Sequence, residues 1–247
     1  MTTASLPKGH TLVLTDDGSH TFFSEAFQEA CHSTAGAKEE TILHYINGCK
    51  VLEKAEFHTP LVIFEVGFGL GLGFLTTQEK ISKNQKLHFI SMEIDKDLLI
   101  WFTGQHPELN LTWKENILEG EVRNTKLTII HGDGRIEVPK YLGKNPTAFH
   151  AIYQDAFSPK KNPTLWTKEW FTLLKSYSHP DVILSTYSAS SSIRKSLHET
   201  GWGIQKGDSF GKKRTSTRAV LKLPTDPEIL DLLNRSPVSA FSDKDLK

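Results

Sequence analysis

Four acidic residues, each at the end of a short apolar run or just after one, are the residues of this sequence best suited to chemistry. They are Glu65, Glu93, Asp133 and Asp155. If the runs are parallel strands, their carboxyl ends meet at one edge of a sheet, and the acids then face a common ligand. Carboxylates there accept hydrogen bonds from hydroxyl and amino groups and stabilise a positive charge. The four acids therefore favour a ligand that carries such groups.

A glycine-rich stretch, FEVGFGLGLGF at residues 64–74, surrounds the first acid. From Glu65 to Gly71, with Gly67 and Gly69 between, it follows E-x-G-x-G-x-G, the pattern of Rossmann-like methyltransferases that use S-adenosyl-L-methionine. It fits neither G-x-G-x-x-G nor G-x-x-x-x-G-K-[ST], which bind phosphate groups. Glycines let the backbone lie against a ligand, and an acid suits a cofactor that carries a sulfonium and no pyrophosphate. Alternatively, the glycines only permit tight packing of a helix on a strand.

The next two acids have both a cofactor-binding and a structural interpretation. Glu93 lies 22 residues past Gly71 (93 minus 71), where Rossmann-type folds place a carboxylate on ribose hydroxyls. Asp133, next to Gly134, follows the third run, where an acid can accept a hydrogen bond from the adenine amino group. Alternatively, Asp133 belongs to a turn and Glu93 caps the helix that starts near Asp95. Acids at four successive strand ends favour the cofactor interpretation.

Short β-rich runs alternate with helix-length segments, and these elements must position the acids. The pattern predicts a mostly parallel, doubly wound sheet. Its five runs are LVIFEV (61–66), LHFISM (87–92), KLTIIH (126–131), FHAIYQ (149–154) and DVILST (181–186). Two further runs, 202–206 and 217–223, predict an antiparallel hairpin that closes the sheet. Ahead of the glycines, residues 11–23 predict a hairpin and residues 37–54 a helix.

The sequence therefore predicts an α/β fold of the Rossmann-like, class I methyltransferase type, with a mostly parallel seven-stranded sheet and an antiparallel C-terminal hairpin. Three units are expected. Residues 1–58 form a small N-terminal extension of hairpin and helix, residues 59–224 form the domain that uses S-adenosyl-L-methionine, and residues 225–247 form a C-terminal helix and tail. A chain of 247 residues can bury one sizeable core.

Composition excludes several classes of protein. Lys plus Arg and Asp plus Glu each total 29, so any contact with nucleic acid must be a local patch. The two cysteines, Cys31 and Cys49, occur without a C-x-x-C or H-E-x-x-H motif, so we expect neither a metal nor a disulfide framework. The N-terminus lacks a signal-peptide pattern and no long apolar run follows, so we expect a cytoplasmic protein that does not enter a membrane.

The stretch QDAFSPKKNPTLW, residues 154–166, resembles a motif of one family, D-[GA]-F-[AS]-P-x-K-N-P-x-[ML]-W. These are the MnmC-type methyltransferases, which complete 5-methylaminomethyl-2-thiouridine at the wobble position of bacterial tRNA. The resemblance includes the glycine turn at 67–75, HFISME at 88–93 and FGKKR at 210–214. It covers about residues 60–220.

The resemblance implies a reaction and its partners. Methyl transfer from S-adenosyl-L-methionine would convert the aminomethyl group of wobble 5-aminomethyl-2-thiouridine, and the anticodon stem-loop of tRNA would be the binding partner. In many bacteria the family's methyltransferase is fused to an FAD-dependent oxidase domain, for which 247 residues leave no room. The resemblance thus implies a stand-alone methyltransferase and a separate enzyme that supplies the aminomethyl precursor. The oligomeric state stays open.

The same resemblance suggests a role for each candidate residue. Asp155 is the catalytic residue, which orients the amine, stabilises its nascent charge and, second, accepts a proton. The cofactor-binding residues are Glu65, Gly67, Gly69, Gly71, Glu93, Asp133, Gly134 and Asp155. The substrate-binding residues are Phe157, Lys161, Asn162, Trp166, Tyr187, Lys212, Lys213 and Arg214, with Lys160, Lys206 and Arg218 nearby. Alternatively, Trp166 is ordinary core and the basic residues are a solvated surface.

Two other functions remain open on the sequence alone. An aminopropyl transferase of the spermidine synthase type shares the fold and an amine acceptor, but the usual G-G-G-[DE]-G-G loop is absent here. A non-catalytic RNA-binding protein that kept a nucleoside pocket is the second alternative. The run around Asp155 argues against such an inactive site.

Overall fold

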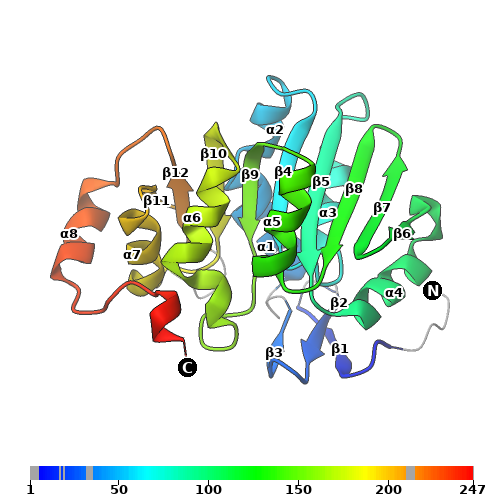
Figure 1. Ribbon diagram of the computed structural model, residues 1–247, viewed down its shortest axis with the longest axis horizontal. Coiled ribbons are helices and arrows are strands. Elements are labelled where there is room, and N and C mark those ends of the chain that lie inside the picture. Colours follow the sequence, from blue (N-terminus) through cyan, green and yellow to red (C-terminus); the bar gives the residue numbers. More distant parts are fainter. Residues whose placement is uncertain (1–5, 17, 19, 32–35, 210–214, 247) are drawn as a thin grey trace.

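A nine-stranded sheet with helices on both faces forms the larger part of the fold (Figure 1). The structure, a computed structural model, describes residues 6–16, 18, 20–31, 36–209 and 215–246. Along the sheet the strands follow the order β11-β12-β10-β9-β4-β5-β8-β7-β6. β4 (Leu61–Val66) lies at the centre, and every residue in it is buried.

The five predicted parallel strands are confirmed. β4 pairs in parallel with β5 on one side and β9 on the other, and β8 and β10 continue the parallel pairing outward. Their bounds are β5 (Leu87–Glu93), β8 (Thr125–His131), β9 (Phe149–Gln154) and β10 (Ser178–Thr186). The chain order reverses between β4 and β9. Ligands of such sheets bind at the carboxyl ends beside this reversal.

Antiparallel strands close both edges of the sheet. The predicted C-terminal hairpin is confirmed as β11 (Gly203–Lys206) and β12 (Thr217–Val220), with β12 next to β10. At the other edge, β7 (Ile117–Val122) and β6 (Thr112–Lys114) extend from β8. The prediction of seven strands was therefore wrong. Charged residues interrupt the apolar pattern of β6 and β7, as is common in edge strands.

Side chains of the parallel strands alternate between two cores, one on each face of the sheet. In β4, Val62 and Phe64 belong to one core and Leu61 and Ile63 to the other. The first core includes residues of α5 (Gly134–Lys144), α6 (Lys168–Ser176) and α7 (Ser191–Glu199), which lie in front of the sheet in Figure 1. The second includes residues of η1 (Ile42–Asn47), α2 (Val51–Ala55), α3 (Leu72–Lys80) and α4 (Lys96–Gln105). Burial on both faces explains why β4 is a continuous apolar run.

The N-terminal residues form a separate three-stranded sheet, drawn in blue at the bottom of Figure 1. The predicted hairpin is confirmed as β1 (His10–Leu14) paired antiparallel with β2 (His20–Ser24), and β3 (Glu29–Ala30) adds to β2. The predicted helix at 37–54 forms as α1 (Ala37–Thr41), η1 and α2. A turn at Lys50, with φ of 55°, interrupts it.

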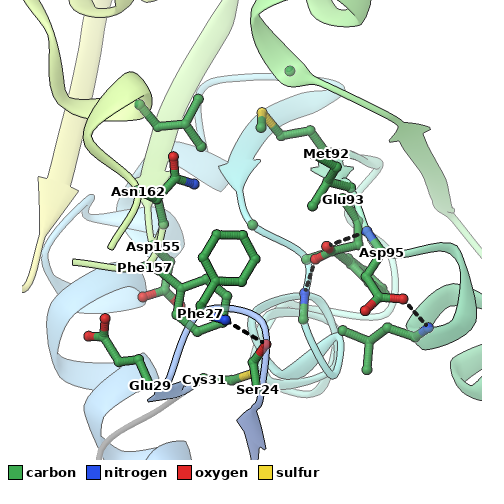
Figure 2. A pocket seen from close by; sticks show the side chains of 18 of the residues that line it. Ser24, Phe27, Glu29, Cys31, Met92, Glu93, Asp95, Asp155, Phe157 and Asn162 are labelled. Carbon is green, nitrogen blue, oxygen red and sulfur yellow. Dashed lines mark hydrogen bonds between the residues drawn. The ribbon is translucent and has the colours of Figure 1, made fainter. Parts of the chain in front are cut away.

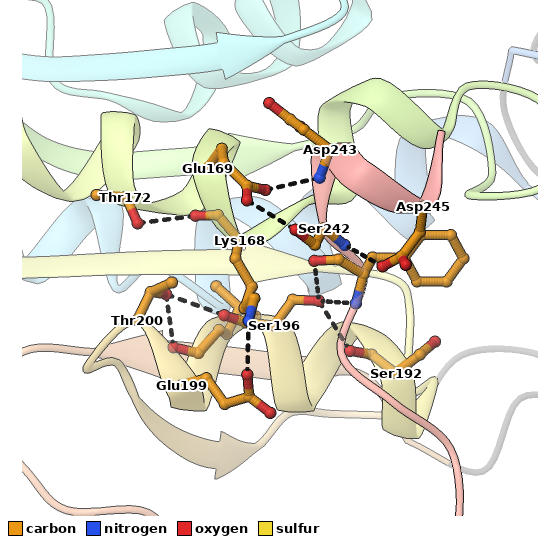
Figure 3. Close-up of polar contacts among 12 residues, drawn as sticks. Lys168, Glu169, Thr172, Ser192, Ser196, Glu199, Thr200, Ser242, Asp243 and Asp245 are labelled. Atoms are coloured by element: carbon orange, nitrogen blue, oxygen red, sulfur yellow. Dashed lines mark hydrogen bonds and ion pairs between the residues drawn. The ribbon is translucent and has the colours of Figure 1, made fainter. Parts of the chain in front are cut away.

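The C-terminal residues lie across α6 and α7 (Figure 3). After α8 (Pro227–Arg235), the chain ends its described part in η4 (Asp243–Asp245). Ser242 Oγ and the backbone N–H of Asp243 donate to the carboxylate of Glu169, at 2.8 and 2.9 Å. The backbone N–H of Phe241 donates to Ser196 Oγ at 2.8 Å. These contacts attach the segment to the helical layer.

Two single-turn helices lie in loops, η2 (Pro107–Leu109) and η3 (Pro163–Trp166). η3 follows β9 and belongs to the motif at residues 154–166. Within the described ranges, no helix has both the length and the apolar character that crossing a membrane requires.

Candidate active site

A cavity of about 560 Å³ opens between the N-terminal sheet and the carboxyl ends of the parallel strands (Figure 2). Its walls come from the glycine turn, the ends of β5, β8 and β9, and the N-terminal segment. Among the described residues that line it there is no lysine or arginine. The carboxyl groups in its walls are those of Glu29, Glu40, Glu93, Asp95, Asp133 and Asp155. Such a cavity suits a ligand that carries positive charge and hydrogen-bond donors.

The glycine turn brings backbone to the cavity. Gly67, Gly69 and Gly71 have φ of 93°, 53° and 71°, in the left-handed region that favours glycine. Gly67 and Gly69 line the cavity, and a Cβ on Gly69 would meet no atom within 4 Å. Gly71 is not among the residues that line it, and a Cβ on Gly71 would overlap the rings of Phe68 and Phe102. The surroundings of Gly67 and Gly71 thus fit the packing interpretation, whereas the open space at Gly69 is compatible with the approach of a ligand, which stays a prediction.

Glu65 lies under the glycine turn and not in the cavity wall. Its side chain is buried, and one carboxyl oxygen accepts from Ser91 Oγ at 3.0 Å. The other oxygen occupies the space that a Cβ on Gly73 would fill. Burial raises the pKa of Glu65 well above its usual range, and the nearby Asp155 adds to this. The expected direct contact with the cofactor therefore does not match its position, which instead supports the turn from below.

Glu93 joins the end of β5 to the glycine turn, and its side chain lines the cavity. One oxygen accepts from the backbone N–H of Gly69 and the other from that of Asp95, both at 2.9 Å (Figure 2). Asp95 itself is the N-cap of α4 and accepts from the N–H of Leu98. Burial raises the pKa of Glu93. Each oxygen keeps a second lone pair, which leaves acceptor capacity for ligand hydroxyls.

Asp133 and Gly134 lie at the start of α5, and both line the cavity. Asp133 is the N-cap, and its Oδ1 accepts from the N–H of Arg135 at 2.9 Å. A Cβ on Gly134 would overlap the side chain of Met92, another residue of the cavity wall. Asp133 therefore has a structural role as an N-cap, not as the turn residue that the sequence suggested, and this role does not conflict with a place in the cavity wall.

Asp155 follows β9 and lines the cavity opposite Glu93 (Figure 2). Its backbone N–H donates to the carbonyl of Val66 at 3.2 Å, which holds it beside the glycine turn. Its carbonyl oxygen lies close to the turn as well, since a Cβ on Gly67 would approach it to 3.2 Å. Its Oδ1 accepts from the hydroxyl of Tyr45 at 2.5 Å. Asp155 is thus held both by the glycine turn and by Tyr45.

The remaining motif residues divide between the cavity and its support. Phe157, Asn162 and Tyr187 line the cavity. Trp166 is fully buried and does not line it; its indole N–H donates to the carbonyl of Phe157 at 2.9 Å. The core interpretation fits Trp166, which supports Phe157 from behind. Lys161 is exposed and lies outside the cavity wall.

The N-terminal segment supplies residues that the sequence did not point to. Phe27 stacks on Phe157 with ring centroids 4.4 Å apart, and Glu29 accepts from Ser158 Oγ at 2.7 Å and from its N–H at 3.2 Å. Ser24, Cys31 and Glu40 line the same wall. The acids and aromatic residues of FSEAFQEAC, residues 23–31, were the available signal. Their partners lie more than a hundred residues away in the sequence, so no local pattern indicates which residues they contact.

The structure describes only part of the basic patch that the sequence predicts. Lys160 and Lys206 are exposed, and Arg218 forms an ion pair with Asp208. Lys212, Lys213 and Arg214 lie outside the described residues. Their proposed contacts stay predictions.

The arrangement fits S-adenosyl-L-methionine. The backbone is open to the cavity at Gly69, and Glu93 ends β5, the position at which Rossmann-type folds bind ribose hydroxyls. Asp133 offers an acceptor at the next strand end. The acids of the walls also suit the sulfonium charge. The residues that would hold the cofactor therefore come from three neighbouring strand ends.

Comparisons with known proteins agree with this geometry. Residues 104–222 match the family described as S-adenosyl-L-methionine-dependent methyltransferase. The tRNA 5-methylaminomethyl-2-thiouridine biosynthesis bifunctional protein MnmC of Azoarcus sp. (strain BH72) is 30% identical over 227 residues, which cover 84% of this chain and 35% of that protein. The MnmC of Burkholderia mallei (strain SAVP1) is 29% identical, with 83% and 34% covered. The chain thus spans about a third of the length of these relatives.

A solved structure resembles nearly the whole chain. The crystal structure of MnmC2 from Aquifex aeolicus has a TM-score of 0.79 and 28% sequence identity, and the match covers 97% of this chain and 81% of that one. The protein is an S-adenosyl-L-methionine-dependent methyltransferase, and S-adenosyl-L-methionine is its cofactor. Together, the comparisons support a methyltransferase of the MnmC type.

Proposed function

We propose that the protein methylates the aminomethyl nitrogen of 5-aminomethyl-2-thiouridine at the wobble position of tRNA, giving 5-methylaminomethyl-2-thiouridine. The observation that carries this proposal is the likeness to MnmC2 over 97% of the chain. The names of the MnmC relatives refer to the biosynthesis of that nucleoside. An acid-lined cavity with Asp155 in its wall is chemically suited to an amine acceptor.

The acceptor amine must be neutral to react. An alkylamine such as that of lysine has a pKa of about 10.4, so keeping it neutral near pH 7 costs roughly 4–5 kcal/mol at about 1.36 kcal/mol per pKa unit. When bound, S-adenosyl-L-methionine supplies an electrophilic methyl group on its sulfonium. The nitrogen–carbon bond forms as the carbon–sulfur bond breaks. Positive charge moves from sulfur to nitrogen, and one proton then leaves the nitrogen.

Asp155 has two opposing effects on this reaction. A carboxylate beside the amine favours the protonated, unreactive form. The same charge stabilises the ammonium that develops in the transition state, and it can accept the departing proton. Asp155 therefore orients the amine and stabilises the nascent charge first, and serves as a base second. Phe157 and Tyr187, in the same walls, exclude water and so lower the pKa of the amine.

A tRNA substrate requires contacts outside the cavity. The wobble base lies in a single-stranded loop, from which it can turn out of its stack toward an enzyme. Contacts to phosphates would hold the anticodon stem-loop in register. The exposed Lys160, Lys161 and Lys206 can supply them, together with the basic residues of the segment 212–214.

The proposed reaction has two consequences, one for where the protein acts and one for the supply of its substrate. A tRNA substrate places the activity in the cytoplasm. Methyl transfer to nitrogen does not create the aminomethyl group, so a separate enzyme must supply it before this protein acts.

The test is methyl transfer from labelled S-adenosyl-L-methionine to tRNA that carries 5-aminomethyl-2-thiouridine, followed by nucleoside analysis. The expected product is labelled 5-methylaminomethyl-2-thiouridine. Asp155→Asn is expected to keep cofactor binding and lose about 100-fold or more in rate. Asp181→Asn, at the start of β10 far from the cavity, is the matched control. The proposal fails if the wild-type protein labels no tRNA, and a label found in a polyamine instead would favour the aminopropyl-transferase type of acceptor.

A further inference from the structure

A hydroxyl group from the N-terminal part of the chain contacts the proposed catalytic carboxylate. Tyr45, on η1, donates from its hydroxyl to Asp155 Oδ1 at 2.5 Å. The two residues are 110 positions apart in the sequence. Tyr45 is 2% exposed, so water does not compete for this hydrogen bond. The contact therefore fixes one oxygen of the carboxylate from the side of η1.

The ring of Tyr45 is itself held in place. It stacks on Tyr153 with centroids 5.1 Å apart and an interplanar angle of 27°. The hydroxyl of Tyr153 in turn forms a hydrogen bond with Thr77 Oγ1 at 3.0 Å. Burial raises the pKa of Tyr45 well above its usual range, and the negative charge of Asp155 adds to the shift. Tyr45 therefore keeps its proton and acts as a permanent donor.

Asp155 needs such a donor because its surroundings are acidic. Neighbouring negative charges disfavour ionisation of a carboxyl group, whereas a hydrogen bond donated to the carboxylate favours it. The titratable groups around this pair come from six elements and the loops beside them. They are Glu29, Cys31, Glu40, His44, Glu65, Glu93, Tyr153 and Tyr187.

We propose that Tyr45 is a positioning residue, whose hydroxyl holds the Asp155 carboxylate ionised and in one orientation toward the acceptor amine. This inference rests on the proposed function of Asp155. It also gives the N-terminal segment a part in the reaction, since η1 lies outside the strands that bind the cofactor. Tyr45 touches neither the cofactor nor the acceptor in this scheme and acts only through Asp155.

The experiment compares wild type with Tyr45→Phe, which removes the hydroxyl and keeps the ring. We expect kcat for methyl transfer to tRNA to fall about 10- to 100-fold, as loss of a hydrogen bond to a charged group predicts. The KM for tRNA and the Kd for S-adenosyl-L-methionine should change less than about twofold, because Tyr45 lines neither site. The acid limb of the pH–rate profile should move to higher pH, since the carboxylate loses a donor that favours its charged form.

Tyr153→Phe is the matched control. It removes a hydroxyl from the other ring of the same buried stack, whose partner is Thr77 and not Asp155. Because phenylalanine keeps the ring on which Tyr45 stacks, this variant should leave kcat and the acid limb unchanged. An unchanged profile in Tyr45→Phe, or an equal loss in both variants, would overturn the positioning role. If the wild-type protein itself transfers no methyl group to tRNA, the proposed function fails and this inference fails with it.

A second variant covers the case in which Tyr45→Phe does not fold. Tyr45→3-fluorotyrosine keeps the ring and the hydroxyl but makes the hydroxyl a stronger acid and so a stronger donor. The acid limb should then move to lower pH with the fold retained. An acid limb that stays at the wild-type pH would overturn the proposal.

Discussion

One carboxylate oxygen of Glu93 lies 2.9 Å from the backbone nitrogen of Gly69 and accepts its hydrogen bond (Figure 2). This contact joins the end of β5 to the glycine turn after β4. Both residues line the cavity, so the acid and the turn form one unit of the proposed cofactor site. The second oxygen of Glu93 holds the N–H of Asp95, at the start of α4. A change at Glu93 therefore affects the shape of the site as well as its charge.

Glu93→Gln should weaken cofactor binding. A glutamine has one acceptor oxygen, so its amide group would face one of the two backbone N–H groups that Glu93 now satisfies. We expect the Kd for S-adenosyl-L-methionine to rise by about tenfold or more, the usual effect of losing a hydrogen bond to a charged group. Isothermal titration measures this. Glu79→Gln, an exposed residue of α3 paired with Lys38, is the control, and equal affinities in the two variants would exclude the role of Glu93.

Gly73→Ala should destabilise the protein although alanine is the better helix former. An added Cβ would overlap a carboxyl oxygen of Glu65, and both residues are buried. Overpacking of this kind costs about 1–3 kcal/mol. Gly143→Ala, in α5, is the control because a Cβ there meets nothing within 4 Å, and it should be neutral or stabilising by about 0.5–1 kcal/mol. Urea unfolding of both variants measures the change in the free energy of unfolding. An unchanged free energy in Gly73→Ala would contradict the position of Glu65.

The parallel strands and the glycine turn could be predicted because their signals are local. LVIFEV is a strand with both faces buried, and residues 67–71 have the glycines that positive φ favours. β6, at the edge of the sheet, and β7 beside it were missed because polar residues interrupt both strands, which therefore carry little apolar signal. The direction in which the Glu65 side chain points was not predicted, for a different reason. A sequence shows an acid beside glycines, but only packing shows that Gly73 leaves room for its side chain.

The contribution of the N-terminal segment could not be predicted at all. Its contacts with the site join Phe27 to Phe157 and Tyr45 to Asp155. Each pair brings together residues more than a hundred positions apart, and no local pattern encodes such a pairing. The strand-end acids were found because the parallel topology itself brings them to one edge. The side chains that the N-terminal segment adds to the site follow no such rule.

Three histidines gather at the opposite edge of the sheet, where the parallel strands begin. Their possible ligand atoms on His58, His150 and His179 lie within 4.8 Å of one another. Nδ1 of His150 accepts from the backbone N–H of Val62 at 2.9 Å. The proton of the neutral His150 ring therefore sits on Nε2, and this ring has no lone pair left to offer to a shared ion. Burial above all, together with the neighbouring His58, His179 and Lys54, lowers the pKa of His150 to about 4.

His150 should therefore make the protein sensitive to acid. Its pKa in the folded state, about 4, lies below the usual 6.5, so the unfolded chain binds more protons between these values. The stability that neutral His150 contributes to the folded state is fully present above about pH 6.5 and is lost as the pH falls toward 4. His150→Asn keeps an acceptor for Val62 but cannot titrate. Urea unfolding at pH 7 and pH 5 should show a larger loss in wild type than in this variant, and parallel losses would disprove the idea.

Lys160→Ala with Lys161→Ala should weaken tRNA binding in a salt-dependent way. Both side chains are exposed and lie in the loop between Phe157 and Asn162, two residues of the cavity wall. If each neutralises one phosphate, the slope of log K against log salt should fall by about 1.4, at roughly 0.7 per contact to single-stranded RNA. The control is Lys83→Ala with Lys86→Ala, an equal change of charge at the opposite edge, in the loop before β5. Fluorescence anisotropy with tRNA across a salt series measures both slopes. If the two double variants had the same slope, the loop beside the cavity would have no specific phosphate contacts, and the tRNA would have to approach from another side.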